Sequence, residues 1–98
     1  MTKFTLTDEV LTCFFAARLD TVVCKDLEIT LSEKMASAPG AVVFNMGQVE
    51  YISSAFLRIC IMTAKRSSTG VFSITDVSPA VKKVFKMAKL DEVLNVQS

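Results

Sequence analysis

The sequence contains no histidine and no tryptophan, and glycine is scarce. Without histidine, the chain lacks the usual general base, the Ser-His-Asp triad and the commonest ligand for transition metals. The three glycines, Gly40, Gly47 and Gly70, stand apart from one another, so no glycine-rich loop is present to hold a phosphate group. We therefore expect a protein that is not an enzyme and that carries no metal or cofactor.

Long apolar runs are also missing. Runs such as 13–17, 41–44 and 59–62 fall far short of the roughly 18–20 apolar residues that cross a bilayer. Residues 1–6 include one lysine but no apolar stretch of the length found in secretory signal peptides. We therefore expect a cytoplasmic protein without direct membrane insertion.

Cysteine occurs only at Cys13, Cys24 and Cys60. Their odd number and wide spacing argue against a disulfide framework, and no CxxC pair indicates a redox or zinc site. All three lie among apolar residues, where cysteine behaves as a small buried hydrophobe. We expect three buried, reduced thiols.

What the chain does contain is a large apolar fraction, 51% of 98 residues. This suits one small domain, spanning 1–98, with a well-filled core. After an initial hairpin, short strand-like segments alternate with helical ones, which predicts an α/β fold with a mixed, largely parallel β-sheet and helices packed against it. The expected strands are 3–6, 10–17, 41–44 and 71–75, and the expected helices run from Asp20 or Thr21 to Pro39-Gly40, from Ser53 or Ser54 to Gly70, and from Ser78-Pro79 onwards.

Each expected helix has an apolar stripe at helical spacing that should face the sheet. The stripes are Cys24, Leu27, Leu31, Met35 and Ala38 in the first helix, Leu57, Cys60 or Ile61, and Ala64 in the second, and Val81, Val84, Phe85 and Ala88 in the third. On this reasoning the lysines of the third helix, Lys82, Lys83, Lys86 and Lys89, lie on its solvent side.

The formal net charge is only +1, but bases and acids are unevenly distributed. Between Arg58 and Lys89 the only acid is Asp76, whereas the first half of the chain carries most of the acids. Such asymmetry could attract an acidic partner surface, although solvated helix faces are the commoner explanation. No interleaved aromatic residues or paired glycine-rich loops accompany the lysines, so we predict no nucleic-acid binding.

Three segments carry a resemblance to a known family. The sequence AVVFNMGQVEYISSAFL at 41–57 is a buried strand, a short approach, two serines and a helix start. Arg18-Leu19-Asp20 forms a turn after a buried strand, and VSPAVKKVF at 77–85 opens the last helix. Together these segments resemble the STAS family of bacterial anti-sigma-factor antagonists, in the family's order and spacing.

The resemblance implies a role in the regulation of transcription through protein binding. Ser54 falls on the family's phosphorylated serine, Leu57 on the leucine after the signature, and Asp20 on the acidic residue of the first strand–helix turn. Members of the family bind an anti-sigma factor, often a serine kinase, and so free a sigma factor. Phosphorylation of the serine then ends the binding. The positive end of the helix dipole stabilises a phosphate at this position, and the added charge alters any partner surface that contacts it.

The chain departs from the family pattern at several positions. Ser53 stands where the family has aspartate, Phe56 where it has glycine, Asn45 where it has the aspartate that ends the buried strand, and Ala17 where it has glycine before the turn. Ser53 and Ser54 are also explained as a plain N-cap pair, worth about 1 kcal/mol and needing no kinase. Phe56 should be turned partly away from the sheet, where it either anchors a partner or covers a loop.

The leading hypothesis is therefore a regulatory module that binds an anti-sigma factor or serine kinase protein. Its expected partner-binding residues are Asp20, Thr21, Val22, Ser53, Ser54, Phe56 and Arg58, with Ser54 as the candidate phospho-acceptor. A second hypothesis is a STAS-like cytosolic subunit of a lipid-transport ATPase assembly. A nucleotide-binding or nucleotide-hydrolysing domain, a third hypothesis, has the least support because no phosphate loop is visible.

Overall fold

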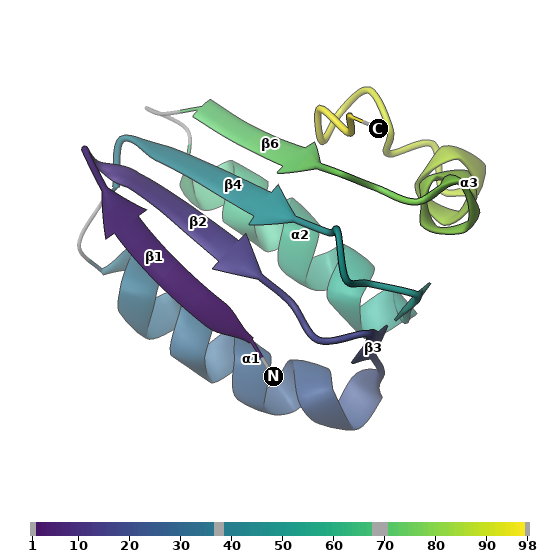
Figure 1. Ribbon diagram of the computed structural model, residues 1–98, viewed down its shortest axis with the longest axis horizontal. Helices are drawn as coiled ribbons and strands as arrows, with labels where there is room; N and C mark the ends of the chain where they lie inside the picture. Colours follow the sequence, from purple (N-terminus) through teal and green to yellow (C-terminus); the bar gives the residue numbers. More distant parts are fainter. Residues whose placement is uncertain (1, 37–38, 68–70, 98) are drawn as a thin grey trace.

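The computed structural model describes residues 2–36, 39–67 and 71–97, and it has a four-stranded sheet with helices on one face (Figure 1). The elements in chain order are β1 (Lys3–Thr7), β2 (Val10–Phe14), β3 (Arg18–Leu19), α1 (Thr21–Met35), β4 (Ala41–Asn45), β5 (Tyr51–Ile52), α2 (Ser54–Arg66), β6 (Val71–Thr75) and α3 (Pro79–Met87). The predicted α/β architecture is confirmed. In the described part of the chain, no helix is both long and apolar enough to span a bilayer.

The sheet is mixed, with strand order β1-β2-β4-β6. β1 and β2 form the predicted antiparallel hairpin, whereas β2 with β4 and β4 with β6 are parallel. The hairpin turn consists of Asp8 and Glu9, both at positive φ (51° and 64°), as a tight two-residue turn requires. Beyond β6, Val96 forms one parallel bridge with Ile74 and so secures the end of the chain to the sheet edge.

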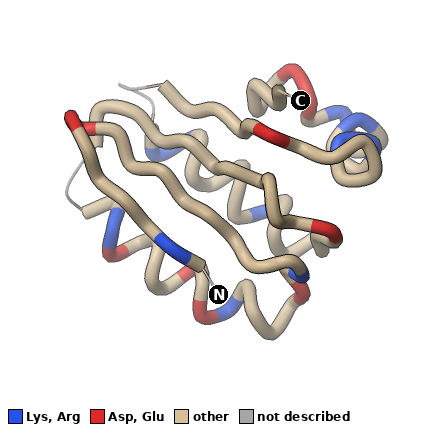
Figure 2. The backbone as a smooth tube through the Cα atoms, in the orientation of Figure 1, with Lys and Arg blue, Asp and Glu red and all other residues tan. Residues whose placement is uncertain are grey.

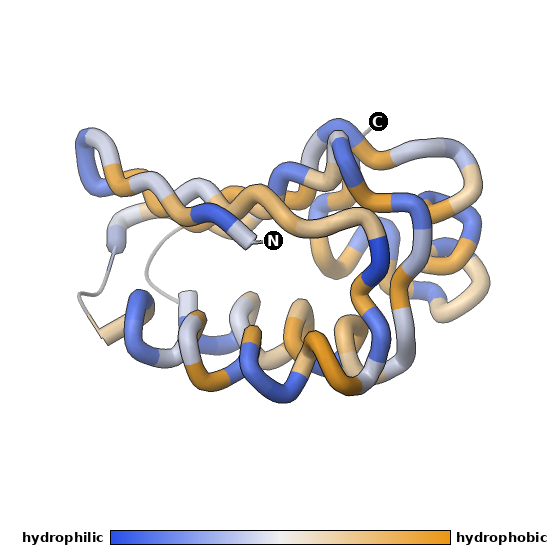
Figure 3. The backbone as a smooth tube through the Cα atoms, turned by 60° about the horizontal axis from the view of Figure 1, so that its bottom comes forward, coloured by the Kyte–Doolittle hydropathy of each residue, from blue (hydrophilic) through white to orange (hydrophobic). Residues whose placement is uncertain are grey.

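Strand residues alternate between two faces of the sheet, and the two faces differ in chemistry. Leu11, Cys13, Val42, Phe44 and Ile74 are buried on the face that α1 and α2 cover. Figure 3 shows these helices as a second layer on one side of the sheet. The opposite face, which no described helix covers, carries smaller side chains such as Thr12, Val43 and Ser73 in one row of the ladder.

α1 follows its predicted pattern. Asp20 is its N-cap, and the predicted stripe residues Cys24, Leu27, Leu31 and Met35 are all buried. The fifth, Ala38, and the predicted end of the second helix at Gly70 lie outside the described residues.

The predicted stripe of α2 is right at Cys60 and otherwise wrong by about one residue. Its buried side chains are Phe56, Ile59, Cys60 and Thr63, whereas Leu57 and Ala64 are only partly buried. Phe56 is fully enclosed, with its ring centroid 5.2 Å from that of Phe15 and 6.0 Å from that of Phe44. Aromatic contacts of this kind, added to the large area of a phenyl ring, favour the burial of Phe56 over Leu57.

The buried stripe of α2 is difficult to recognise in the sequence because one of its members is polar. Thr63 occupies the fourth buried position, and its hydroxyl donates to the Ile59 carbonyl at 2.8 Å. Because the hydroxyl is satisfied within the helix, burial of Thr63 carries little cost.

The predicted stripe of α3 is half right. Ser78 caps the helix and Pro79 takes its first position as expected, and Val81 and Phe85 are buried. Val84, 38% exposed, and Ala88 face solvent instead. α3 lies beyond one end of the sheet and not flat over it (Figure 1), so one pair of residues a turn apart suffices to attach it.

The three cysteines are buried and free, as predicted. Burial raises the pKa of the Cys13 thiol to about 12, and it raises the pKa of the Cys60 thiol well above its ordinary value. The thiolate is the reactive form of cysteine, so both residues act as core hydrophobes.

Phe56→Ala should lower the free energy of unfolding by about 3–5 kcal/mol, because it empties a fully enclosed aromatic site. Urea unfolding of the two proteins measures the difference. The matched control is Met62→Ala on the same helix, where the side chain is 42% exposed and a loss below about 1 kcal/mol is expected. A loss for Phe56→Ala no larger than that of the control would contradict the aromatic cluster.

Candidate functional site

The starts of α1 and α2 lie side by side because the two short strands before them pair. β3 and β5 form a separate parallel ladder, with Arg18 opposite Tyr51 and Leu19 opposite Ile52. The ladder continues into the helix start, where the Ser53 amide donates to the Leu19 carbonyl at 3.0 Å. Two segments far apart in the sequence therefore present one surface at the carboxyl ends of the strands.

Both helices begin with a side-chain cap. The Asp20 carboxylate accepts from the Val23 amide at 2.9 Å, and the Ser53 hydroxyl accepts from the Phe56 amide at 3.4 Å. Ser53 is 9% exposed, and its hydroxyl also lies 3.8 Å from the Cys24 thiol. Capping by these two residues fixes where each helix starts.

Ser54 is the first residue of α2 and is exposed. Of the two adjacent serines, Ser53 is engaged in the cap, whereas the Ser54 hydroxyl has no hydrogen-bond partner among the described residues. The first turn of α2 contains no acidic residue that would offset the positive end of the helix dipole. A negative group on Ser54 would be stabilised there by the helix itself.

The remaining predicted partner-binding residues differ in exposure. Thr21 and Arg58 are exposed, and Val22 is 74% exposed although it is apolar. Asp20 is half-buried because its carboxylate serves the cap. Phe56, predicted to point outward, does not reach this surface at all, since its ring lies in the core. The sequence-based placement of Phe56 is therefore corrected.

A shallow groove runs between the first halves of α1 and α2, next to Ser54. It has a volume of about 260 Å³, and Lys25 and Arg58 contribute basic groups to it from opposite sides. Glu28 is the acidic side chain that lines it. The groove therefore joins the two helix starts into one uneven surface with both signs of charge.

Two residues of this surface were missed by the sequence analysis. The Arg18 guanidinium carbon lies 4.8 Å from the centre of the Tyr51 ring, and Tyr51 is 43% exposed. Arginine over an aromatic face is a favourable cation–π arrangement. Tyrosine and arginine are also enriched among the residues that dominate protein interfaces. The pair depends on the β3–β5 register. Strands of two residues are too short to be recognised from a sequence pattern.

A polar cluster closes the ends of β4 and β6 near the same edge. The Asn45 amide nitrogen donates to the Asp76 carboxylate at 2.9 Å, while the Asn45 side-chain oxygen accepts from the Gly47 amide at 2.9 Å. The Thr75 hydroxyl donates to the same Asp76 carboxylate oxygen at 3.3 Å. Across 2–36, 39–67 and 71–97, no group of three or more potential ligands is placed to hold a metal ion.

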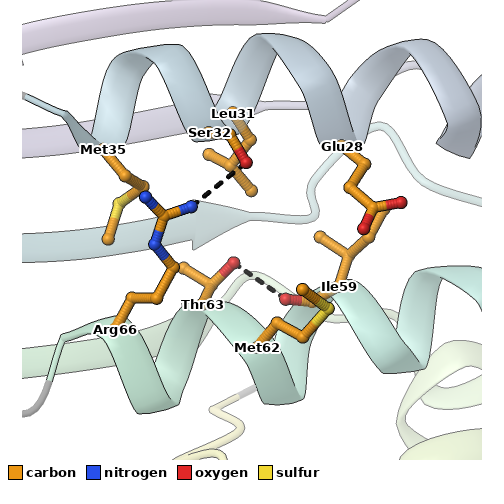
Figure 4. A pocket seen from close by; sticks show the side chains of 8 residues that line it. All are labelled: Glu28, Leu31, Ser32, Met35, Ile59, Met62, Thr63 and Arg66. Atoms are coloured by element: carbon orange, nitrogen blue, oxygen red, sulfur yellow. Dashed lines mark hydrogen bonds between the residues drawn. The ribbon is translucent and has the colours of Figure 1, made fainter.

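Farther along the two helices, a small pocket separates their second halves (Figure 4). Arg66 donates to the Ser32 hydroxyl at 3.1 Å across it, and Met35 and Met62 fill its sides. Its volume of about 20 Å³ is far below the roughly 300 Å³ at which ligand pockets begin. This pocket belongs to the packing between helices.

No lysine of α3 lines the groove. Figure 2 shows the basic positions of α3 on a part of the backbone separate from α1 and α2. Lys83, Lys86 and Lys89 are exposed as predicted, and Lys82 is partly buried. The exposed lysines, Lys83 and Lys86 of α3 and Lys89 just after it, form a solvated basic face.

The comparison with protein families decides the assignment. The family model of the STAS domain matches residues 3–98. The chain belongs to the STAS family. A protein of Bordetella bronchiseptica, BtrV, provisionally described as an anti-sigma factor antagonist, is 32% identical to this STAS domain over 66 residues. That match takes in 65% of the chain and 57% of BtrV, so the chain spans little more than half of this relative.

Solved structures share the fold over nearly the whole chain. An anti-sigma-factor antagonist STAS protein from Planctomyces limnophilus superimposes with a TM-score of 0.86 at 26% identity, over 99% of this chain and 88% of the other. Unphosphorylated SpoIIAA, an anti-sigma factor antagonist, gives 0.87 at 16% identity, over 100% and 88%. SpoIIAA from Bacillus has also been solved phosphorylated, and this form gives 0.78 at 14% identity, over 100% and 91%. This STAS domain therefore has the fold of the anti-sigma-factor antagonists.

Asn45→Asp restores the residue that the family has at the end of β4, and we expect it to destabilise this STAS domain at pH 7 by about 1 kcal/mol. The amide that now donates to Asp76 at 2.9 Å would become a second carboxylate. The loss should shrink as the pH falls toward about 4, because the pair of neighbouring carboxylates then binds a proton in the folded protein and the repulsion ends. Urea unfolding at both pH values measures it.

The double variant Asn45→Asp/Asp76→Asn is the matched control. It returns one amide and one carboxylate to the cluster with their positions exchanged. It should recover most of the stability at pH 7. Equal loss at both pH values would show that packing, and not charge, distinguishes asparagine from aspartate here.

Proposed function

We propose that this STAS domain is a non-enzymatic regulatory module that docks on an anti-sigma factor of the serine-kinase type and so releases a sigma factor. The family membership and the shared fold of anti-sigma-factor antagonists support this role. The observation that carries the proposal is the exposure of Ser54 at the first position of α2, directly beside the start of α1. A partner that covers one helix start there must also meet the other.

The docking surface combines apolar, aromatic and charged groups, as interfaces between proteins do. Val22 and Tyr51 supply exposed apolar area, Arg18 lies over the Tyr51 ring, and Arg58 adds a second exposed arginine. We define the docking surface as Arg18, Asp20, Thr21, Val22, Tyr51, Ser54 and Arg58. Ser53 and Phe56 act from beneath it, one as the cap and the other as the core residue that holds the first turn of α2.

Phosphorylation of Ser54 is the proposed switch. The partner kinase transfers the terminal phosphoryl group of ATP to the Ser54 oxygen, and ADP and the hydroxyl proton leave. The modification adds about −1.5 to −2 charges at pH 7 without requiring the fold to change, because Ser54 is exposed and lies at a helix N-terminus. A partner pressed against this helix start would meet both the added volume and the added charge.

Ser54→Asp should weaken binding to the anti-sigma factor encoded by the same genome about tenfold or more, a difference of about 1.4 kcal/mol, whereas Ser54→Ala should bind like the wild type. Calorimetry with the purified pair measures this. Ser32→Asp is the matched control, since it adds the same charge on an exposed serine near the other end of α1. Its affinity should not change.

Two results would overturn this reading in different ways. Equal affinities for Ser54→Asp and Ser54→Ala would remove the switch and leave the docking. Failure of the wild type to bind the anti-sigma factor, together with its co-purification in a membrane-bound lipid-transport ATPase, would instead support a structural subunit of that assembly.

Val22→Asp should lower the same affinity about tenfold without lowering stability, because it places a charge on an exposed apolar side chain of the docking surface. Ile29→Asp provides a close control. Ile29 lies on the same outer side of α1 two turns later and is 64% exposed, compared with 74% for Val22. Equal effects of the two variants would place the contact along α1 and not at its start.

A further inference from the structure

The groove beside Ser54 holds two basic side chains, one of them part of the docking surface. Arg58 lies four residues after Ser54 and is exposed, and Lys25 faces the same groove from α1. Neither has a hydrogen-bond or ion-pair partner among the residues that the structure describes. Glu28, which also lines the groove, is not within ion-pair distance of them. These bases are therefore available to an incoming anion.

Helix geometry places Arg58 within reach of Ser54. Residues four apart on a helix are neighbours on its surface, with about 5–6 Å between their Cβ atoms. Side chains on a helix lean toward its N-terminus, so the long Arg58 side chain extends back toward the Ser54 oxygen and can meet a phosphate there. Arginine binds phosphate through two parallel hydrogen bonds, which makes such pairs stronger than an ordinary surface ion pair.

The exchange at position 53 favours the same pairing. An aspartate at this position, as in the family pattern, would put a carboxylate directly beside the phosphate. Ser53 caps α2 without any charge, and the first turn of α2 contains no acid. The repulsion that would otherwise oppose a phosphate at this helix start is absent.

We propose that the phosphate on Ser54 is held in cis by the Arg58 guanidinium, with Lys25 adding to the positive field from α1. This proposal rests on the proposed function, in which Ser54 is the modified residue. Phosphorylation then acts on the docking surface twice: it adds negative charge, and it withdraws Arg58 from contact with an acidic group of the partner. The phosphate and the basic groups that bind it therefore belong to the same chain.

The test uses the full chain with phosphoserine incorporated at position 54 during translation, so that neither a kinase nor the partner is needed. A ³¹P NMR titration gives the second pKa of the phosphate, which is about 6 for a free phosphoserine. We expect the value at Ser54 to lie below that of the same protein with Arg58→Gln by about 0.5, because the guanidinium stabilises the dianion. Arg58→Lys should give an intermediate value, since it keeps the charge and loses the two-pronged geometry.

Arg66→Gln is the matched control, because Arg66 is exposed at the far end of the same helix. It should leave the titration unchanged, and Lys25→Gln should move it in the same direction as Arg58→Gln but less. Far-UV circular dichroism verifies that all variants are folded. Identical titrations for wild type and Arg58→Gln would overturn the proposal.

The two proposals can fail separately. If Ser54→Asp expels the partner but the phosphate titrates independently of Arg58, the switch operates by repulsion alone and the cis pairing is wrong. If the phosphate pairs with Arg58 but neither Ser54→Asp nor phosphorylated Ser54 loses affinity for the anti-sigma factor, the proposed switch is wrong, while the docking and the cis pairing both stand.

Discussion

The arrangement of the surface around Ser54 depends on one short parallel ladder. β3 and β5 contribute two residues each, and the Ser53 amide extends the pairing by one hydrogen bond to the Leu19 carbonyl. Because a helix starts immediately after each strand, the ladder fixes the position of both helix starts at once. A backbone constraint of three residue pairs thus determines which side chains share the docking surface.

The aromatic cluster beneath this ladder explains how the chain tolerates a large departure from the family pattern. Phe56 replaces a glycine, yet its ring is fully enclosed beside Phe15 and Phe44. The added volume is accommodated inside the core, so the outer side of the first turn of α2 keeps Ser54 and Arg58 exposed. The departures at positions 53 and 56 therefore change the residues beneath the surface more than the residues exposed on it.

The sequence predicted the elements well because they depend on local patterns. Alternating strands, the caps at Asp20 and Ser78, and the spacing of the α1 stripe are all visible without long-range information. The orientation of α2 could not be predicted in this way, since the stripes through Leu57 and through Phe56 are about equally apolar. The choice between them is made by Phe15, which directly follows β2, and by Phe44 in β4.

The face of the sheet that no described helix covers is separate from the face that carries the helices and the docking surface. Side chains such as Thr12, Val43 and Ser73 contribute little to the core, and they lie on the opposite side of the sheet from the helices. Substitutions there leave the packing between the sheet and the two helices unchanged. Evolution can therefore alter this side independently of the other, which leaves room for a second specificity to arise without loss of the first.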